Sequence, residues 1–304
     1  MTSPGHQRFR SLLFIPGNRA DMLVKGPRYS PGGFIPDLED SVPISEKSAA
    51  RGIVAAAIPT LAATGRSIVP RVNSLRTGLT ADDIGAVVTP QVTAISIGKI
   101  NGAGDIEQVA EMLAARENEL GLPVGSVGIL PWIETAAAVV NVNAICAASE
   151  RVRWIAFGAE DFSADMGISR TVDSESRSEA GSYGEPGLLY ARSAVTIAAR
   201  AAGVQAFDTP YVMFRDTEGL KADCALARSI GFTGKMAIHP AQVEVIEAAF
   251  SPTQQDIERA RRIMDVASEA AHDGRGSISL DGEMIDAPVV ARARNVLRDA
   301  GILE

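Results

Sequence analysis

Carboxylate residues follow two apolar stretches of this sequence at the points where the stretches end. Residues 152–157 (VRWIAF) form a β-branched and aromatic run, and after two small residues come Glu160 and Asp161. Residues 126–135 (SVGILPWIET) finish in the same way, with Glu134. Runs this short predict buried strands rather than helices. Acids at strand ends predict an oxygen-rich site for a hard cation, whereas Glu160 or Asp161 alone would equally cap the next helix or face its dipole.

The composition is typical of a soluble globular protein. Its 304 residues with 46% hydrophobic content can bury a large core, as one large α/β domain or as two smaller ones. The net charge of −8 comes from scattered acids, which argues against nucleic acid as a general partner. Cys146 and Cys224 have no metal-ligand spacing and are predicted to be packed thiols in a reducing compartment.

No segment predicts export or membrane insertion. The N-terminal stretch MTSPGHQRFR is polar and leads into only a short apolar run, unlike a signal peptide. No apolar stretch approaches the roughly 20 residues that a membrane helix needs. We therefore expect a soluble, cytoplasmic protein that has neither nucleic acid nor a membrane as its partner.

Strand-like and helix-like segments alternate along the chain. Eight apolar runs predict strands, at residues 11–16, 33–38, 67–72, 93–98, 126–132, 152–157, 203–207 and 235–238. Helix-like segments lie between or after them, at residues 45–63, 104–120, 134–149, 187–202, 217–230 and 240–249. This alternation is typical of parallel βαβ units. Eight units in a chain of this length favour a (β/α)8 barrel over an open doubly wound sheet, and no G-x-G-x-x-G follows the first strand.

The barrel prediction also says where chemistry should lie, because barrel enzymes carry their sites at the C-terminal ends of the strands. Nearly every predicted strand delivers a polar or charged residue there. In chain order these residues are Asn18, Arg19, Glu39, Asp40, Arg71, Asn73, Lys99, Glu134, Asp161, Asp208 and His239.

Two segments do not fit the barrel repeat. Residues 168–186 are polar and rich in Ser, Glu and Gly, which predicts an insertion, either a loop near the site or a solvated one. The other follows the barrel, which we place at residues 1–250. Residues 251–304 contain a helix at about 253–272, a glycine-rich turn region and a last helix from near Asp286. Since the barrel is complete before them, we expect a lid or an arm that packs on a neighbouring subunit.

Motifs along almost the whole chain resemble those of the HpcH/HpaI aldolase–citrate lyase family, in the branch of citrate lyase β-subunit-like proteins and malyl-CoA lyases. They are RSLLFIPGNR (10–19), DLEDSVPISEKSAAR (37–51), PRVNS (70–74), IET (133–135), AFGAEDFSADMG (156–167), GFTGKMAIHPAQ (231–242) and DGEMIDAP (281–288). The resemblance implies a (β/α)8 barrel with a C-terminal lid, assembled into homotrimers or hexamers.

The resemblance also implies roles for the acids and for one arginine. Glu134 and Asp161 match carboxylates that hold Mg²⁺, with Mn²⁺ as an alternative and water completing the shell. Glu39 and Asp40 match acids that orient metal-bound water, although a capped strand-to-helix turn would also explain them. Arg71 matches the arginine that holds the substrate and the developing enolate oxygen. A structural salt bridge from Arg71 to Glu39 or Asp40 is a compatible alternative.

Further residues match positions that contact coenzyme A in the family. Phe14, Arg19 and Lys25 are the first group, although without the resemblance the two cations would be ordinary surface charge. Lys235, Ile238 and His239 belong to a motif that borders the thioester, although a lone histidine before a proline is more often structural.

Asp286 matches an acid–base residue that the family's lid delivers to an adjacent subunit. Its alternative is an N-cap, with Ala287 and Pro288 opening the last helix. The chain departs from the family at Pro36 and at Gly98, where an aliphatic residue and a proline are more usual. Both departures put the identity of the substrate in doubt more than the chemistry.

The resemblance implies a Mg²⁺-dependent carbon–carbon lyase. It would cleave or form a 3-hydroxyacyl-CoA such as malyl-CoA, citramalyl-CoA or citryl-CoA, with an acyl-CoA and a 2-oxo acid as the other partners. One alternative is a thioesterase that acts on a similar CoA thioester. Another is a CoA-independent 2-oxo acid aldolase, which uses a histidine near the second strand, where residues 37–42 have none. The last is a non-catalytic metabolite-binding subunit.

Overall fold

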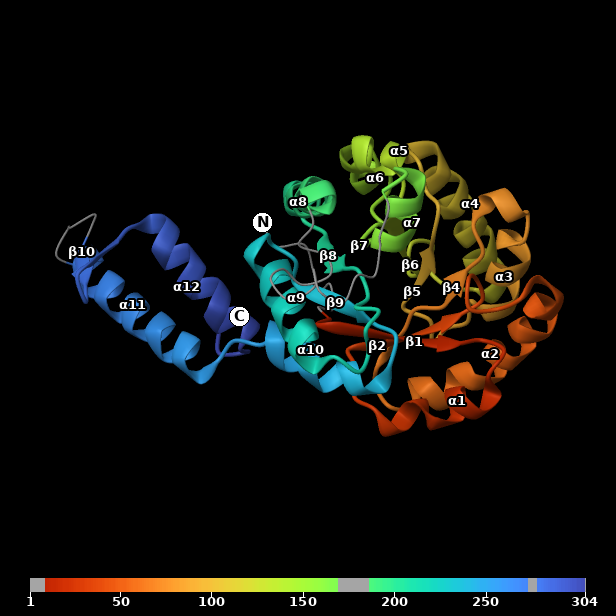
Figure 1. Ribbon diagram of the computed structural model, residues 1–304, viewed down its shortest axis with the longest axis horizontal. Coiled ribbons are helices and arrows are strands. Elements are labelled where there is room, and N and C mark those ends of the chain that lie inside the picture. Colours follow the sequence, from red (N-terminus) through yellow and green to blue (C-terminus); the bar gives the residue numbers. More distant parts are fainter. Residues whose placement is uncertain (1–8, 169–185, 273–277, 304) are drawn as a thin grey trace. The chain divides into compact units, whose positions relative to one another are not determined.

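The computed structural model describes residues 9–168, 186–272 and 278–303 (Figure 1). Nearly all of the predicted insertion at residues 168–186 lies outside the described residues, so its role stays a prediction. The chain divides into two compact units between Ala249 and Phe250. The first unit contains the barrel, and the second contains two helices joined by a hairpin.

The first unit is a closed ring of parallel strands. They are β1 (Ser11–Pro16), β2 (Gly33–Asp37), β3 (Ser67–Ile68), β4 (Arg71–Val72), β5 (Ala94–Ile97), β6 (Gly128–Ile133), β7 (Trp154–Phe157), β8 (Gln205–Asp208) and β9 (Gly234–Ala237). The order is β1-β9-β8-β7-β6-β5-β4-β2-β3, and β1 pairs with β2 to close the ring. The short β3 and β4 act as one strand, because Val69 N between them still donates to Phe34 O at 2.9 Å. The predicted (β/α)8 barrel is confirmed.

Every strand of the ring contributes to a packed interior. The cluster comprises Phe9, Leu12, Ile35, Val69, Ala94, Leu130, Trp132, Trp154, Ala156, Phe207 and Met236. Phe9 stacks on Trp154 with ring centroids 5.4 Å apart. The buried Trp132 Nε1 donates to Ser96 Oγ at 2.8 Å, which satisfies its polar edge. Because alternate residues of a strand face opposite sides, the neighbours of these residues point toward the surrounding helices.

Helices surround the ring (Figure 1). They are α1 (Ala20–Lys25), α2 (Lys47–Ala62), α3 (Thr80–Val87), α4 (Ala103–Leu120), α5 (Ala136–Val140), α6 (Val142–Ala147), α7 (Ala159–Asp165), α8 (Pro186–Ala202), α9 (Thr217–Ser229) and α10 (Val243–Phe250). Short 3-10 helices occur at Gly26–Arg28, Ile44–Glu46, Leu75–Thr77 and Pro240–Gln242. In α2 the buried residues recur every three or four positions, giving one apolar face: Ala50, Val54, Ile58 and Leu61.

The sequence analysis gave no bounds for α1, α3 or α7, although it expected a helix after residues 152–157 that Glu160 or Asp161 could cap. These helices have six to eight residues, so each spans about two turns and shows too little of the helical period to be recognised. Among the described helices, none combines the length and the apolar character needed to cross a membrane.

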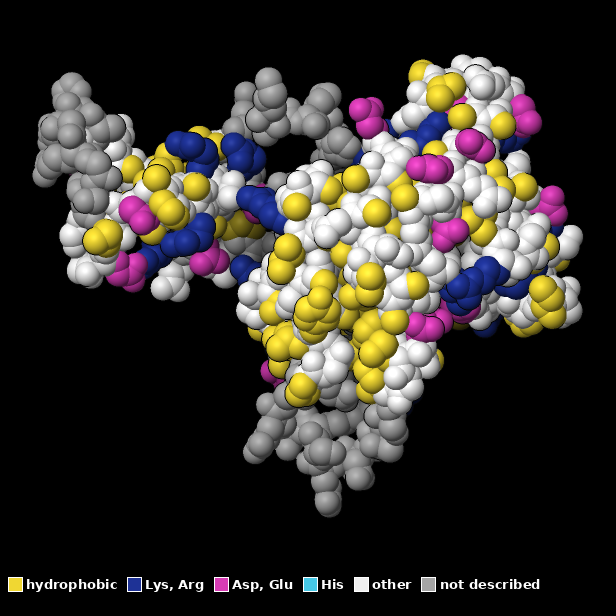
Figure 2. Space-filling view, turned by 90° about the horizontal axis from the view of Figure 1, so that it is seen from above, with side chains coloured by type: hydrophobic (Ala, Val, Ile, Leu, Met, Phe, Trp, Pro, Cys, Tyr) yellow, Lys and Arg dark blue, Asp and Glu magenta, His cyan; other side chains and the backbone are white. Residues whose placement is uncertain are grey.

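One face of the first unit exposes apolar side chains. Seen from above α5, α6 and α8, hydrophobic side chains gather there with few charges among them (Figure 2). The exposed large hydrophobic residues of α5, α8 and the end of α7 are Val140, Met166, Leu189, Tyr190 and Ile197. Exposed apolar patches of this kind commonly mark protein–protein interfaces.

A fully buried network of charges joins α8 and α9 to the outside of the ring. Lys235 Nζ lies 2.5 Å from both Asp208 Oδ2 and Asp223 Oδ2. Arg192 contacts the same two carboxylates, at 2.8 Å and 3.3 Å. Burial alone would lower the pKa of Lys235, but the two carboxylates raise it above its ordinary value, so the lysine stays charged. Two cations and two acids balance each other here.

This network corrects the role that the motif suggested for Lys235. Met236 faces the barrel interior, so the alternation of the strand turns Lys235 outward, toward the helices. Its side chain is completely buried and cannot border a thioester at the barrel mouth. Asp208, which had no predicted role, belongs to the same structural network.

Replacing Lys235 by methionine tests the importance of this network. Lys235→Met leaves two buried carboxylates with only Arg192 to balance them, so we expect a loss of about 3–5 kcal/mol of unfolding free energy in urea. Lys221→Met is the matched control, because Lys221 pairs with Glu218 on the surface at 2.8 Å and should lose less than ~1 kcal/mol. Equal losses in the two variants would contradict the assignment.

The second unit is a helical pair with its own core. It contains α11 (Gln254–His272), β10 (Ile278–Leu280), β11 (Glu283–Ile285) and α12 (Ala287–Asp299). The antiparallel β10 and β11 turn at Asp281 and Gly282, whose φ angles of 51° and 85° suit a two-residue hairpin. The buried core residues of this unit are Ala260, Ile263, Ile285, Ala293 and Leu297.

Asp286 caps the N-terminus of α12. Its Oδ1 accepts a hydrogen bond from Val289 N at 3.2 Å, and Pro288 lies in the first turn. The capping interpretation of Asp286 is therefore present in the structure. Its acid–base role, and the packing of this unit on a neighbouring subunit, stay predictions.

Candidate active site

The predicted metal ligands meet at the C-terminal ends of β6 and β7. Glu134 directly follows β6 and is buried, whereas Asp161 lies in the first turn of α7 with 44% of its side chain exposed. Gly158, the N-cap of α7, allows this approach. A Cβ at position 158 would lie 2.6 Å from both Cβ and Oε2 of Glu134, so any larger residue would displace that carboxylate.

Lys99 links the acids of the site. Its backbone N donates to Glu134 Oε1 at 2.6 Å. Its Nζ lies 3.1 Å from Glu39 Oε1, 3.1 Å from Asp40 Oδ1 and 3.9 Å from Asp161 Oδ1. Lys99 adopts a left-handed backbone with a φ of 58°, which is unusual for a residue with a side chain. The strand-end pattern included Lys99, but nothing in the sequence indicated that it contacts so many acids.

Gly98 gives these carboxylates room. A Cβ at position 98 would lie 2.7 Å from Glu134 Oε1 and 3.0 Å from Glu39 Oε2. Those distances are shorter than or at the edge of real Cβ contacts, so the two carboxylates occupy space that a larger residue would fill. The glycine that replaces the more usual proline at position 98 therefore makes room for Glu134 and Glu39 at the floor of the site.

Arg71 is held mainly by Asp37, a partner that the sequence analysis missed. Arg71 Nε and Nη2 donate to the two oxygens of Asp37 at 2.6 Å and 2.7 Å, a bidentate pair. Its Nη1 lies 3.1 Å from both Glu39 Oε2 and Asp40 Oδ2, so the predicted salt bridges are also present. Burial alone would raise the pKa of Asp37, but the charge and hydrogen bonds of Arg71 lower it. The register Asp37↔Arg71 between β2 and β4 creates this pair.

Phe14 forms the floor under Arg71. The Arg71 guanidinium carbon lies 4.9 Å from the Phe14 ring centroid, and the ring packs on Trp132 at 5.7 Å. This places Phe14 against the barrel interior. Whether it also contacts coenzyme A stays a prediction.

The other predicted coenzyme contacts lie in the segments that follow two neighbouring strands, β1 and β9. Arg19 and Lys25 are exposed at the two ends of α1, and both pair with Asp21, at 3.0 Å and 3.7 Å. Ile238 and His239 follow β9, which pairs with β1. Asp286 belongs to the second unit, so its place at the site stays a prediction.

Comparison with known proteins now identifies the family. The model of the HpcH/HpaI aldolase/citrate lyase family matches residues 10–240. The chain belongs to this family. It is 40% identical over 292 residues to a citrate lyase subunit beta-like protein of Deinococcus radiodurans, covering 95% of this chain and 96% of that one. It is 29% identical over 302 residues to the mitochondrial citramalyl-CoA lyase of Rattus norvegicus, covering 95% and 85%.

A solved structure supports the same relationship. The CitE protein of Mycobacterium tuberculosis, in complex with magnesium, acetoacetate and coenzyme A, superposes with a TM-score of 0.76. It is 27% identical in sequence, and the match covers 96% of this chain and 98% of that one. The predicted family is confirmed, and so is the predicted class of enzyme, a carbon–carbon lyase.

The charge balance of the site in this family member suits a divalent cation. The site holds five carboxylates, those of Asp37, Glu39, Asp40, Glu134 and Asp161, and three cations lie beside them: Arg71, Lys99 and Lys47, whose Nζ donates to Glu39 O at 2.8 Å. Burial, and then the charges of Asp161 and Glu39, raise the pKa of Glu134 to about 8. Burial also raises the pKa of Glu39. An added Mg²⁺ would relieve this repulsion, so the residues present fit the ion.

The number of ligands also suits Mg²⁺. Within the described ranges, no group of three or more His, Cys, Asp or Glu side chains is arranged to hold a metal. Glu134 and Asp161, the two carboxylates that the family resemblance implies as metal ligands, are a set of this small size. Mg²⁺ tolerates such a sparse set because it keeps several waters and takes oxygens from its substrate.

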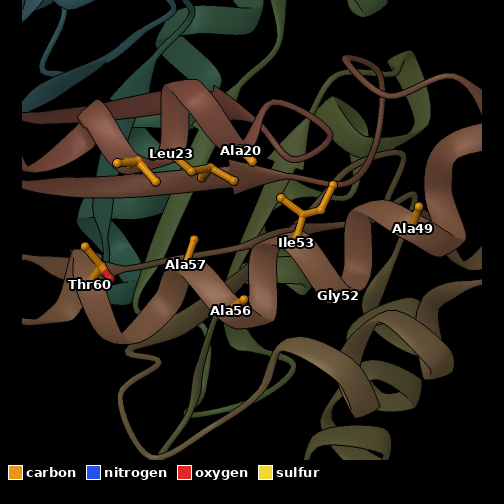
Figure 3. Close-up of a pocket in the computed structure, with 9 residues that line it drawn as sticks. Ala20, Leu23, Ala49, Gly52, Ile53, Ala56, Ala57 and Thr60 are labelled. Carbon is orange, nitrogen blue, oxygen red and sulfur yellow. The ribbon is translucent and has the colours of Figure 1, made fainter.

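A separate groove between α1 and α2 has no such chemistry (Figure 3). It has a volume of about 460 Å³ and is lined by Ala20, Leu23, Val24, Ala49, Gly52, Ile53, Ala56, Ala57 and Thr60. None of these side chains can bind a metal ion through a carboxylate or move a proton near neutral pH. The candidate active site is the strand-end cluster and not this groove.

Magnesium binding should depend on pH. Because the pKa of Glu134 is about 8, this carboxyl group holds a proton at pH 7, and the ion must displace it. We expect the Mg²⁺ affinity to rise between about pH 6 and pH 9, with close to one proton released per ion at pH 7. Calorimetry in two buffers with different ionisation enthalpies measures that proton. Glu134→Gln should abolish the release, and an affinity that stays constant over this range would contradict the assignment.

The stability of the metal-free protein should follow the same group. The folded-state pKa of Glu134 lies above its ordinary value of 4.5, so its stabilising contribution is lost as the pH rises through about 8. Glu134→Gln removes that titration. Its melting temperature should therefore fall less than that of the wild type over the same pH range.

Proposed function

We propose that this protein is a Mg²⁺-dependent lyase that cleaves or forms a short 3-hydroxyacyl-CoA. The products of cleavage would be an acyl-CoA and a 2-oxo acid. The observation that carries the proposal is the strand-end cluster, in which Arg71 and Lys99 hold Glu39, Asp40, Glu134 and Asp161 around one point. Relatives named citramalyl-CoA lyase, and a related structure with magnesium and coenzyme A, support this substrate class.

The steps of the cleavage reaction determine what the protein must provide. A proton leaves the 3-hydroxyl group, the C2–C3 bond breaks, and the electron pair passes to the acyl thioester as an enolate. The enolate then takes a proton at C2. The protein must therefore bind a carboxylate-bearing substrate, stabilise charge on the thioester oxygen and exclude water while the enolate exists.

Arg71 and Lys99 are suited to stabilising that charge. Asp37 fixes the guanidinium of Arg71 in one orientation, and Phe14 supports its face, so little reorganisation accompanies the reaction. Lys99 remains 28% exposed in the site. Glu134 and Asp161 would hold Mg²⁺, which when bound acts as a Lewis acid toward oxygens of the 2-oxo acid portion. Glu39 and Asp40 would orient water around it.

Product analysis tests the proposed reaction. Malyl-CoA, citramalyl-CoA and citryl-CoA are each incubated with the protein and Mg²⁺, and both the 2-oxo acid and free thiol are measured. We expect at least one substrate to release a 2-oxo acid in equal amount to an acyl-CoA. Release of free coenzyme A without a 2-oxo acid would instead identify a thioesterase, and no turnover of any thioester would favour a binding subunit.

Conservative variants make that test specific. Glu134→Gln and Asp161→Asn should each lower kcat by at least about a hundredfold, since each removes one of two proposed metal ligands. Both keep the size of the side chain, and unchanged melting curves at low pH would show that the barrel is intact. Full Mg²⁺-dependent activity in both variants would place the metal elsewhere.

We also propose that the protein acts as a homo-oligomer, a trimer or hexamer, in which Asp286 serves a neighbouring site as the acid–base residue. The apolar face over α5 and α8 supports association. The separate core of the second unit supports an arm that keeps its own structure. An arm over the site would also exclude water, as an enolate requires.

Subunit mixing tests the shared site. Asp286→Asn is the sharp variant, because asparagine caps a helix as well as aspartate does but cannot exchange the proton. Asp286→Asn and Glu134→Gln proteins should each be inactive. After dissociation and joint reassembly, some sites would combine an intact barrel with an intact arm, so activity should partly return. Mixed oligomers that stay inactive, or full activity of Asp286→Asn alone, would limit Asp286 to capping.

A further inference from the structure

Arg71 and Lys99 both contact the carboxylates of the site, but they are held in different ways. Asp37 binds the Arg71 guanidinium through two hydrogen bonds and Phe14 lies under it, so only 11% of the arginine side chain is exposed. Lys99 reaches the acids with a single ammonium group at the end of a flexible side chain that is 28% exposed. Arg71 is therefore a fixed cation of the site, whereas the ammonium group of Lys99 is able to move.

Several carboxylates converge on the ammonium group of Lys99. Its Nζ donates to Glu39 Oε1 and to Asp40 Oδ1, both at 3.1 Å, and lies 3.9 Å from Asp161 Oδ1. An ammonium group is a compact, strongly hydrated charge with three donors, so it attracts oxygens much as a hard metal ion does. Lys99 thus places its charge in surroundings of the kind that Mg²⁺ prefers.

The backbone of Lys99 fixes the base of this side chain. Its φ angle is 58°, and its N atom donates to Glu134 Oε1 at 2.6 Å. One residue therefore touches one proposed metal ligand, Glu134, with its backbone and approaches the other, Asp161, with its side chain. A left-handed conformation at a residue with a side chain persists only where its surroundings stabilise it. Here it directs the ammonium group at the proposed pair of ligands.

The charge of Lys99 affects the site in two opposite ways. Burial alone would lower the pKa of Lys99, but the charges of Glu39 and Asp40 raise it above its ordinary value, so the group stays charged. In the absence of Mg²⁺, this charge compensates carboxylates that would otherwise repel one another. When Mg²⁺ approaches the same carboxylates, the like charge of the ammonium group opposes it.

We propose that Lys99 is a positioning residue that acts as an internal cation of the site. It holds the acids together before Mg²⁺ binds, and it competes with the ion for them, so that loading of the metal displaces the ammonium group. This inference rests on the proposed function and goes beyond it, because it makes Lys99 the residue that limits the affinity for Mg²⁺.

Lys99→Met separates this role from a merely structural one, because the two roles predict opposite signs. Removal of a competing cation should strengthen Mg²⁺ binding by about tenfold or more, measured by calorimetry on the full-length protein. Loss of a merely structural lysine would leave the carboxylates poorly placed, and Mg²⁺ binding would weaken. An unchanged or lower affinity in Lys99→Met would overturn the proposal.

Two further lysine variants serve as controls. Lys99→Arg keeps the positive charge and should not gain affinity for Mg²⁺. Lys47→Met removes a charge from the same region, but Lys47 Nζ donates to the carbonyl groups of Leu38 and Glu39, at 2.9 Å and 2.8 Å, and not to carboxylates. It should therefore strengthen Mg²⁺ binding much less than Lys99→Met does. Equal gains in the two methionine variants would show that net charge alone sets the affinity, and would contradict the direct competition.

Thermal unfolding gives a second readout that needs no substrate. Without Mg²⁺, Lys99→Met should melt at a lower temperature than the wild type, because Glu39 and Asp40 lose a compensating charge. The same concentration of Mg²⁺ should then raise the melting temperature of the variant more than that of the wild type, since a ligand stabilises the folded state according to its affinity. A smaller rise in the variant would count against the internal cation.

Activity assays keep this inference separate from the proposed function. If the wild type cleaves a CoA thioester with Mg²⁺ but Lys99→Met does not bind the ion more tightly, the lyase stands and the internal cation is wrong. If no thioester is cleaved, the internal cation still stands provided that Lys99→Met gains Mg²⁺ affinity and that adding Glu134→Gln abolishes the gain. In that case the proposed reaction is wrong.

Discussion

The bidentate pair between Asp37 and Arg71 is the interaction on which the site depends. It joins β2 to β4 at the mouth of the barrel and fixes the one arginine that also contacts Glu39 and Asp40. Without it, the neighbouring acids would face each other with Lys99 and Lys47 to compensate them. Even with Arg71, Lys99 and Lys47 beside them, the carboxylates outnumber the cations, and the pKa of Glu134 is raised first by its burial and then by the charges of Asp161 and Glu39. A site of this kind stays folded without metal but gains from a divalent cation.

The backbone adapts to that crowding at two glycines and one lysine. Gly98 and Gly158 both stand where a Cβ would overlap Glu134, so the chain approaches this carboxylate from two sides. Lys99 accepts a left-handed backbone conformation, which costs free energy that the surrounding contacts offset. In return its N–H group binds Glu134 and its ammonium group binds Glu39 and Asp40. Local strain and close approach therefore occur where the chemistry is expected.

A second charge network lies on the other side of the same sheet and has a different purpose. The network of Lys235, Asp208, Asp223 and Arg192 is fully buried and balanced, so it can fix helices to strands but offers nothing to a substrate. The mouth cluster is unbalanced and partly exposed. The contrast shows why a charged residue in a strand cannot be assigned to catalysis until the face on which it lies is known. Charge balance and access to solvent distinguish the two roles.

The sequence by itself determined the barrel, its eight strands and the strand ends at which acids collect. The alternation of apolar runs with helical segments depends on residues that are close together in the chain, so it can be read from the sequence without knowledge of the fold. The pairing of Asp37 with Arg71 depended on register between strands that are distant in the chain, and DLED offered three acids with no means of choosing among them. Successive residues of β9 point to opposite faces of the sheet, and the sequence does not say which of them face the barrel interior. Only the structure shows that Lys235 points outward. The Phe214–His239 stack joins the segments that follow β8 and β9, which lie side by side because those two strands pair, so the tertiary structure alone decided it.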